Sequence, residues 1–227
     1  MENIIKSKTR GNLIVISGPS GAGKGSIIQG LLANNPNLWL SVSMTSRKIR
    51  GQEVDGREYY FITREEFLKK VEEGEFLEYT EYSGNYYGTP RGKINSHLAS
   101  GHDVILEIEI EGALKIKELV PEALFIFIMP PSTKILAERL RNRKTETEDK
   151  ILRRFKTAYQ EINEVTKYNY VIVNDDLDKA IEKAKAILLA ERCRVDRIEE
   201  MYVGSEEEFL HEALVDNKEF VNEERQI

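Results

Sequence analysis

The chain has 227 residues, 41% of them hydrophobic and 32% charged, which suits one compact α/β domain with a well-solvated surface and room for mobile inserts. The formal net charge of −6 argues against general nucleic-acid binding, because such binding usually needs a basic face. Cys193 is the only cysteine, so an intrachain disulfide is excluded and a reducing compartment is expected. Residues 1–10 lack the apolar segment of a secretory signal, and the longest apolar run, residues 123–129, is too short to span a bilayer. We therefore expect a cytoplasmic protein without a membrane partner.

Short apolar runs alternate with longer helical patterns along the chain. The pattern predicts strands at 13–17, 103–109, 123–129 and 170–174, and helices at 24–33, 111–119 and from 177 to about 192. Strands separated by helices indicate parallel βαβ crossovers, so the expected fold is a doubly wound α/β sheet.

Two stretches interrupt this alternation and are interpreted as an insert and a lid on a single domain. The first contains strand-like runs and a helix that begins at a capping box formed by Thr63 and Glu66. The second is helical, dense in arginine and interrupted by a polar patch at 142–149 that could act as a hinge. The expected parts are a core (about 11–40, 90–131 and 150–196), an insert (about 41–89), a lid (about 132–149) and an acidic tail (about 197–227), the last a solvated helix with a frayed end.

A glycine-rich loop lies between the first predicted strand and the first predicted helix. It consists of Gly18, Pro19, Ser20, Gly21, Ala22, Gly23, Lys24, Gly25 and Ser26. Its glycines let successive backbone N–H groups turn toward an anion, the helix adds its positive end, and Lys24 can reach β- and γ-phosphates. The strict motif has Ser or Thr directly after the lysine, whereas Gly25 precedes Ser26 here. This variant resembles the loop of nucleoside monophosphate kinases, in which magnesium is held largely through water, and we expect ATP as its ligand.

The insert carries side chains suited to a second phosphate and to a base. Arg47 and Arg50 can hold a phosphate dianion with two guanidinium groups, and the hydroxyls of Tyr59 and Tyr87 can donate to the same group. The carboxylate of Glu78 can accept from N1–H and N2–H₂ of guanine together, whereas adenine would present a lone pair at N1.

With these motifs in this order and spacing from residue 13 to residue 194, the chain resembles guanylate kinase of the bacterial type. The resemblance implies a P-loop NTPase-type sheet with an inserted nucleoside-monophosphate-binding subdomain and a helical lid. It implies ATP-dependent phosphorylation of GMP, and of dGMP, to the diphosphate, in purine nucleotide metabolism, with Mg²⁺ bound together with ATP and a possible homodimer. The implied GMP site consists of Ser43, Arg47, Arg50, Tyr59, Glu78, Tyr87, Gly88, Thr89 and Glu109. Tyr86 is expected to pack the core of the insert instead.

An acidic pattern marks the second predicted strand of the core. The carboxyl end of a strand beside the glycine-rich loop should lie in the ligand crevice, where a carboxylate can orient magnesium-bound water. The resemblance places Glu107 near the metal, together with Ser26, and Glu109 at the guanine amino group. The family pattern usually has Asp at both positions, so both side chains here are one methylene longer. Glu111 is expected at the surface.

Three arginines are expected to surround the transferring phosphoryl group. Arg139 and Arg143 are four residues apart on one helix face, and Arg154 follows on the next helix. The resemblance assigns them to a lid over ATP, and assigns Asn174 and Asp175 to the adenine side. The acceptor phosphate is already anionic, so no protein general base is expected. Catalysis should come from positioning and charge neutralisation by Mg²⁺ and by Lys24, Arg47, Arg139, Arg143 and Arg154.

Two alternatives remain open at this stage. Another nucleotide kinase, with AMP or a bisphosphate sugar as acceptor, would share the loop and the lid but would not need Glu78 beside Ser43 and Thr89. A guanylate-kinase-like interaction module without enzymatic activity could dispense with Lys24 and the lid arginines, and it usually accompanies other domains. The phosphate lysine and the arginines are present in this chain.

Overall fold

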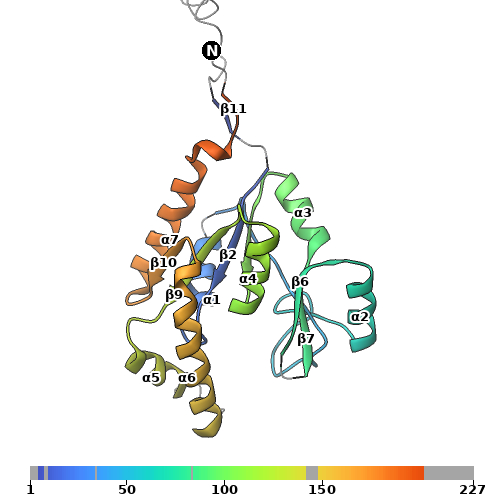
Figure 1. Ribbon diagram of the computed structural model, residues 1–227, viewed down its shortest axis with the longest axis vertical. Helices are drawn as coiled ribbons and strands as arrows, with labels where there is room; N and C mark the ends of the chain where they lie inside the picture. The colour runs from blue at the N-terminus through green and yellow to red at the C-terminus, as the bar shows by residue number, and fades with distance from the viewer. Residues whose placement is uncertain (1–4, 8–9, 34, 83, 142–147, 202–227) are drawn as a thin grey trace, which may run out of the picture. The chain divides into compact units, whose positions relative to one another are not determined.

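The computed structural model describes residues 5–7, 10–33, 35–82, 84–141 and 148–201 (Figure 1). The chain divides into two units, one of residues 9–190 and one of residues 1–8 together with 191–227. No helix among the described residues is long and apolar enough to cross a membrane.

The larger unit is built on a parallel sheet, which in the described residues has five strands in the order β10-β9-β2-β8-β3. These strands are β2 (Leu13–Ser17), β3 (Leu38–Leu40), β8 (Asp103–Glu107), β9 (Leu124–Met129) and β10 (Tyr170–Val173). The first of them, β2, lies between β8 and β9, so the chain winds outward from it in both directions. A crevice at the carboxyl ends of the strands on either side of such a switch point is the usual ligand site of this architecture.

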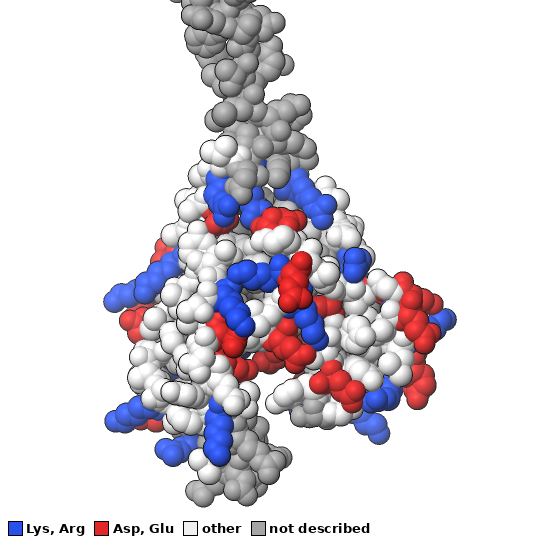
Figure 2. Space-filling model, in the orientation of Figure 1, with Lys and Arg blue, Asp and Glu red and all other residues white. Residues whose placement is uncertain are grey.

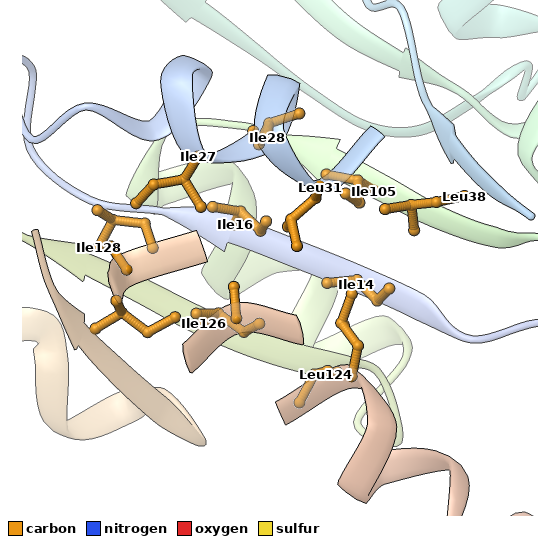
Figure 3. Packing of buried hydrophobic residues seen from close by; sticks show 14 of the residues in the cluster. Ile14, Ile16, Ile27, Ile28, Leu31, Leu38, Ile105, Leu124, Ile126 and Ile128 are labelled. Carbon is orange, nitrogen blue, oxygen red and sulfur yellow. The ribbon is translucent and has the colours of Figure 1, made fainter. Parts of the chain in front are cut away.

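Helices cover both faces of this sheet. On one face α1 (Lys24–Leu32) and α7 (Leu177–Arg192) pack against isoleucines of the strands, among them Ile14, Ile16 and Ile126 (Figure 3). On the other face α3 (Arg91–Ala99) and α4 (Ile110–Leu119) pack against Val15 and Phe125, among others. Burial of each such side chain contributes about 1.5–3 kcal/mol, so the central strands are the rigid base from which the loops project. The predicted doubly wound sheet is confirmed.

The insert forms a second sheet, whose described strands are ordered β5-β4-β7-β6. They are β4 (Met44–Thr45), β5 (Tyr60–Phe61), β6 (Phe76–Tyr82) and β7 (Asn85–Pro90), with α2 (Arg64–Glu72) beside them. The predicted capping box is confirmed, because the Glu66 backbone N–H donates to Thr63 Oγ1 (3.1 Å) and the Thr63 N–H donates to Glu66 Oε2 (2.8 Å). Phe67 of α2 is buried and stacks on Phe76 and Tyr86, with ring centroids 4.5 and 5.2 Å away. Tyr86 therefore packs the core of the insert, as predicted.

The lid region comprises α5 (Thr133–Arg141) and α6 (Glu148–Ile162), followed by the 3₁₀ helix η1 (Asn163–Lys167). Leu136, Leu140 and Ala158 form a small buried cluster between the two α-helices. Arg143 and most of the predicted hinge lie outside the described residues, as does the side chain of Arg154.

One predicted strand boundary is wrong, and the first residues of the tail differ from the prediction. The strand predicted at 103–109 ends at Glu107, because the chain turns there and the extended Glu109 (φ −69°, ψ 159°) is the N-cap of α4. The tail was expected to be a solvated helix with a frayed end. Its described residues instead form the strand β11 (Ile198–Met201), which follows the 3₁₀ helix η2 (Val195–Arg197) and pairs antiparallel with β1 (Ile5–Ser7), and the rest of the tail lies outside the described residues. Such a pairing depends on a segment almost 200 residues away, which the composition of the tail does not reveal.

Candidate active site

The glycine-rich loop joins the carboxyl end of β2 to α1, as predicted, and two of its positions admit only glycine. Gly18 has φ 146° and a Cβ there would lie 2.1 Å from the carbonyl oxygen of Ile128. Gly23 has φ 92° and a Cβ there would lie 2.3 Å from Asn174 Nδ2. Gly23 is also the N-cap of α1, and it has no side chain that could occupy the first N–H donors of the helix. Those donors and the helix dipole make this end of α1 suited to a phosphate.

Lys24 is folded back onto the loop. Its Nζ donates to the carbonyl oxygens of Gly18 (2.6 Å) and Pro19 (3.4 Å). The ammonium group therefore lies over the loop backbone, where its present acceptors are carbonyl oxygens that phosphate oxygens could replace.

One cavity beside the loop, of about 320 Å³, brings together residues predicted for ATP. It is lined by Gly21, Gly23, Ser26, Arg139, Asn174, Asp175 and Leu177. Arg139 Nη2 donates to the carbonyl oxygen of Asn174 (3.1 Å), and Asn174 Nδ2 donates to that of Ala22 (2.8 Å). These two hydrogen bonds connect Arg139 of the lid region to the end of β10, and the end of β10 to the loop. Leu177 was not predicted; the signal for it was an apolar residue at a helix start two residues after the predicted adenine-side pair.

A second cavity, of about 240 Å³, holds the predicted metal-side residues. It is lined by Ser20, Gly21, Gly23, Lys24, Gly25, Ser26, Glu107 and Glu109. Partial removal from water by the surrounding protein raises the pKa of the Glu107 carboxyl. The negative charge of Glu109 adds to this rise, and the positive charge of Lys24 opposes it. Hydroxyl and carboxylate oxygens are the hard ligands that Mg²⁺ prefers, so Ser26 and Glu107 fit a magnesium ion carried by phosphates. Figure 2 shows the surface hollowed between the insert sheet and the α5–α6 pair.

On the insert side, Arg47 is already paired with a carboxylate. Its side chain is 7% exposed, and Nη1 and Nη2 donate to Glu53 Oε2 (2.9 Å) and Oε1 (2.8 Å). The N–H of Arg50 also donates to Glu53 Oε2 (2.8 Å). These hydrogen bonds hold the pKa of Glu53 below its usual range, with that from Arg47 contributing most. Glu53 was not predicted; a carboxylate three residues after Arg50 was the available signal.

Aromatic rings surround this ion pair. The Arg47 guanidinium lies 5.4 Å from the ring centroid of Tyr59, and the Tyr59 and Tyr87 rings meet edge to face at 5.8 Å. Burial raises the pKa of Tyr59, so its hydroxyl stays protonated and can donate near neutral pH. The structure therefore brings three of the predicted phosphate-side residues together. The fourth, Arg50, is exposed.

Other residues of the predicted GMP site have different surroundings. Gly88 of β7 has a packing role, because a Cβ there would lie 2.7 Å from Phe76 Cδ1 and 2.9 Å from Phe67 Cζ. Ser43 is half-buried directly before β4, an inner strand of the insert sheet, and its carbonyl oxygen accepts from the Tyr60 N–H (2.9 Å).

Glu78 and Thr89 form a buried polar pair across β6 and β7. The two residues lie opposite each other in the sheet, and Thr89 Oγ1 donates to Glu78 Oε1 (2.6 Å). Glu78 is 8% exposed, and burial raises the pKa of its carboxyl although the Thr89 hydrogen bond lowers it. No lysine or arginine within the described residues forms an ion pair with it. A buried carboxylate without a paired cation is costly, so hydrogen-bond donors from a ligand would be strongly favoured here.

Comparisons with known proteins agree on one family. The guanylate kinase family matches residues 10–191 of this chain. A guanylate kinase of Clostridium perfringens (strain SM101 / Type A) is 51% identical over 216 residues, covering 95% of this chain and 100% of the relative. A guanylate kinase of Caldanaerobacter subterraneus subsp. tengcongensis is 52% identical over 201 residues, covering 88% of this chain and 98% of the relative. The crystal structure of guanylate kinase from Anaplasma phagocytophilum has a TM-score of 0.71 at 33% identity, covering 93% of this chain and 98% of that one. The chain belongs to the guanylate kinase family.

Proposed function

We propose that this chain transfers the γ-phosphoryl group of ATP to GMP, and also to dGMP, in the purine nucleotide metabolism of the cytoplasm. As a member of the guanylate kinase family the chain is a phosphotransferase, and its reaction is ATP + GMP to ADP + GDP. The observation that best supports guanine as the base is the buried Glu78–Thr89 pair. Its carboxylate suits the adjacent N1–H and N2–H₂ donors of guanine and opposes the N1 lone pair of adenine.

The ATP side of the proposal is supported by the two cavities beside the loop. Backbone N–H groups of residues 18–26 and the Lys24 ammonium would hold the phosphates, and Asn174 and Asp175 would contact the adenine side. Arg139 lines the first cavity, and we propose that Arg143 and Arg154 join it around the γ-phosphate.

The GMP side of the proposal assigns phosphate and base to different residues. Arg47, Arg50, Tyr59 and Tyr87 would bind the phosphate, with Arg47 exchanging part of its Glu53 pairing for phosphate oxygens. The base would be read by a separate set of residues, namely Glu78, Glu109, Ser43, Thr89 and the backbone of Gly88.

Ser26 and Glu107 would hold Mg²⁺, mostly through water. The ion, when bound with ATP, supplies charge neutralisation at the phosphate oxygens. Neither a nucleic acid nor a membrane is expected as a partner, and a homodimer is a further proposal that sedimentation would test.

The chemistry needs positioning and positive charge from the protein. An anionic oxygen of the GMP phosphate attacks the γ-phosphorus, and the bond from that phosphorus to the bridging oxygen of ADP breaks in line. No proton has to leave the nucleophile, so no general base is required. Lys24, Arg47 and Arg139 would neutralise the charge spread over the transferring oxygens, in a site from which water is excluded.

A coupled assay of diphosphate formation with GMP, dGMP, AMP, CMP and UMP tests the proposal. We expect GMP and dGMP to be preferred over AMP by about 10⁴-fold in kcat/KM, since the buried carboxylate penalises the wrong base. Equal or better use of AMP would favour another monophosphate kinase. Absence of turnover with every acceptor would favour a binding module.

A further inference from the structure

Gly112, in the first turn of α4, lies directly against the carboxyl group of Glu78. A Cβ built on Gly112 would lie 3.0 Å from Glu78 Oε2, 3.3 Å from Cδ and 3.6 Å from Oε1. All three of the nearest atoms belong to this one carboxyl group. The absence of a side chain at position 112 therefore leaves the space that the carboxylate occupies.

The backbone of α4 does not require glycine at this position. Gly112 is helical and is not among the glycines with positive φ. A glycine inside a helix is less favourable than alanine, so this residue weakens the helix in which it lies. The close approach of Glu78 is the feature of the structure that accounts for it.

The helix is fixed where it meets β6, so it cannot simply move away from an added methyl group. Thr80 Oγ1 donates to Glu111 Oε1 (3.2 Å), and Lys115 Nζ donates to the carbonyl oxygen of Tyr79 (3.1 Å). The next residue of the helix, Ala113, is fully buried in the core cluster on that face of the central sheet. An added methyl group would therefore displace the Glu78 carboxylate rather than the helix.

The carboxylate is also held from its other oxygen. Thr89 donates to Oε1, while Oε2 is the oxygen nearest to Gly112. Displacement by a few tenths of an ångström would stretch the Thr89 hydrogen bond, turn Oε2 away from its present position, or both.

We propose that Gly112 is a specificity-determining positioning residue, whose missing side chain sets the position at which Glu78 meets the guanine base. This inference rests on the proposed function, because it concerns the same base site. Gly112 acts through Glu78 and touches no reacting atom.

The test compares Gly112→Ala with a matched control, Gly92→Ala. Gly92 also lies in the first turn of a helix, α3, and a Cβ there would meet nothing within 4 Å. Both substitutions add one methyl group to a helical glycine. Gly92→Ala should leave the melting temperature unchanged or raise it, and Gly112→Ala should stay within a few degrees of wild type, because the gain in helix propensity offsets the strain on the Thr89 hydrogen bond. We expect Gly112→Ala alone to lower kcat/KM for GMP about tenfold, with KM for ATP unchanged, since misplacement of a positioning group by 1 Å can reduce rates about 100-fold.

Two further measurements separate positioning from a general structural effect. IMP presents N1–H but lacks the 2-amino group, so Gly112→Ala should reduce its use less than that of GMP. In a Glu78→Ala background, Gly112→Ala should change kcat/KM for GMP less than about twofold, because non-additivity reports a shared contact.

The inference is overturned if Gly112→Ala matches Gly92→Ala on GMP, or if it impairs GMP, IMP and ATP alike or unfolds the protein at the assay temperature. Full additivity with Glu78→Ala also contradicts it. A wild-type chain that does not phosphorylate GMP would overturn the proposed function, and this inference with it. If the wild-type chain phosphorylates GMP and Gly112→Ala does not change this activity, only the inference is overturned.

Discussion

Replacement of Glu78 by glutamine tests the proposed base-reading role, because it keeps the shape of the side chain and removes its charge. In the structure Thr89 donates to Oε1 at 2.6 Å, so the amide oxygen should take that place. The NH₂ group then stands where Oε2 is now and faces a guanine donor. One charge-assisted hydrogen bond is replaced by two opposed donors, at about 2–4 kcal/mol. This corresponds to roughly 30- to 1,000-fold in kcat/KM for GMP, since each 1.4 kcal/mol is a factor of ten.

The same substitution should stabilise the empty protein at neutral pH. Burial raises the pKa of Glu78, so the ionised carboxyl reduces stability above its ordinary pKa, and this penalty is absent well below it. Glu78→Gln should therefore melt at a higher temperature than wild type at pH 7, with the difference shrinking toward acid pH. A loss of activity together with a gain of stability distinguishes a binding role from a structural one.

The assay couples diphosphate formation to NADH oxidation, with GMP and ATP varied in turn. The matched control is Glu81→Gln, on the same strand but exposed, which should behave as wild type. KM for ATP should be nearly unchanged in both variants. If Glu78→Gln used GMP as well as wild type does, Glu78 would not read guanine and the acceptor would have to be reassigned.

Four further predictions follow from the geometry. Lys24→Ala should keep its melting temperature within a few degrees while turnover falls by orders of magnitude; near-normal kcat would contradict the loop assignment. Arg50→Ala should impair GMP and IMP by the same factor, because its proposed role is to bind the phosphate; a base-dependent loss would contradict that role. Glu53→Gln should raise KM for every monophosphate, because it frees Arg47 from its present position. The pKa of Glu53 is lowered in the folded protein, so its pairing with Arg47 stabilises the fold above the ordinary carboxyl pKa, and this stabilisation is lost as the pH falls through the lowered pKa. The melting temperature of the variant should therefore lack this decrease at acid pH. A chain ending at Arg197 should retain turnover, because the family match ends at residue 191; loss of activity would give β11 a role in function.

Local patterns in the sequence were sufficient to predict the phosphate loop and four of the five described strands of the central sheet; the short strand β3 (Leu38–Leu40) was not predicted. The strand before Gly18 and the helix after it are adjacent in sequence, so motif, turn and helix start could be identified together. The capping box at Thr63 was predicted for the same reason, because both partners lie within four residues of each other.

The features that the sequence did not predict depend on contacts whose partners cannot be chosen before the chain is folded. The position of Arg47 follows from Glu53, and any of several nearby carboxylates could have been its partner. The contact of Gly112 with Glu78 joins a core helix to an insert strand 34 residues earlier, and a lone glycine carries no mark of its neighbour. The pairing of β1 with β11 joins the two ends of the described chain, where periodicity gives no sign of a partner.

The central claim is that the phosphate of GMP accepts the γ-phosphoryl group of ATP. Incubation of the wild-type chain with GMP and γ-³²P-labelled ATP, followed by separation of the nucleotides, follows the group itself. The label should move into the β-phosphate of GDP, with little inorganic phosphate formed. Label that stays in ATP, or is released as phosphate at the same rate with and without GMP, would contradict the account.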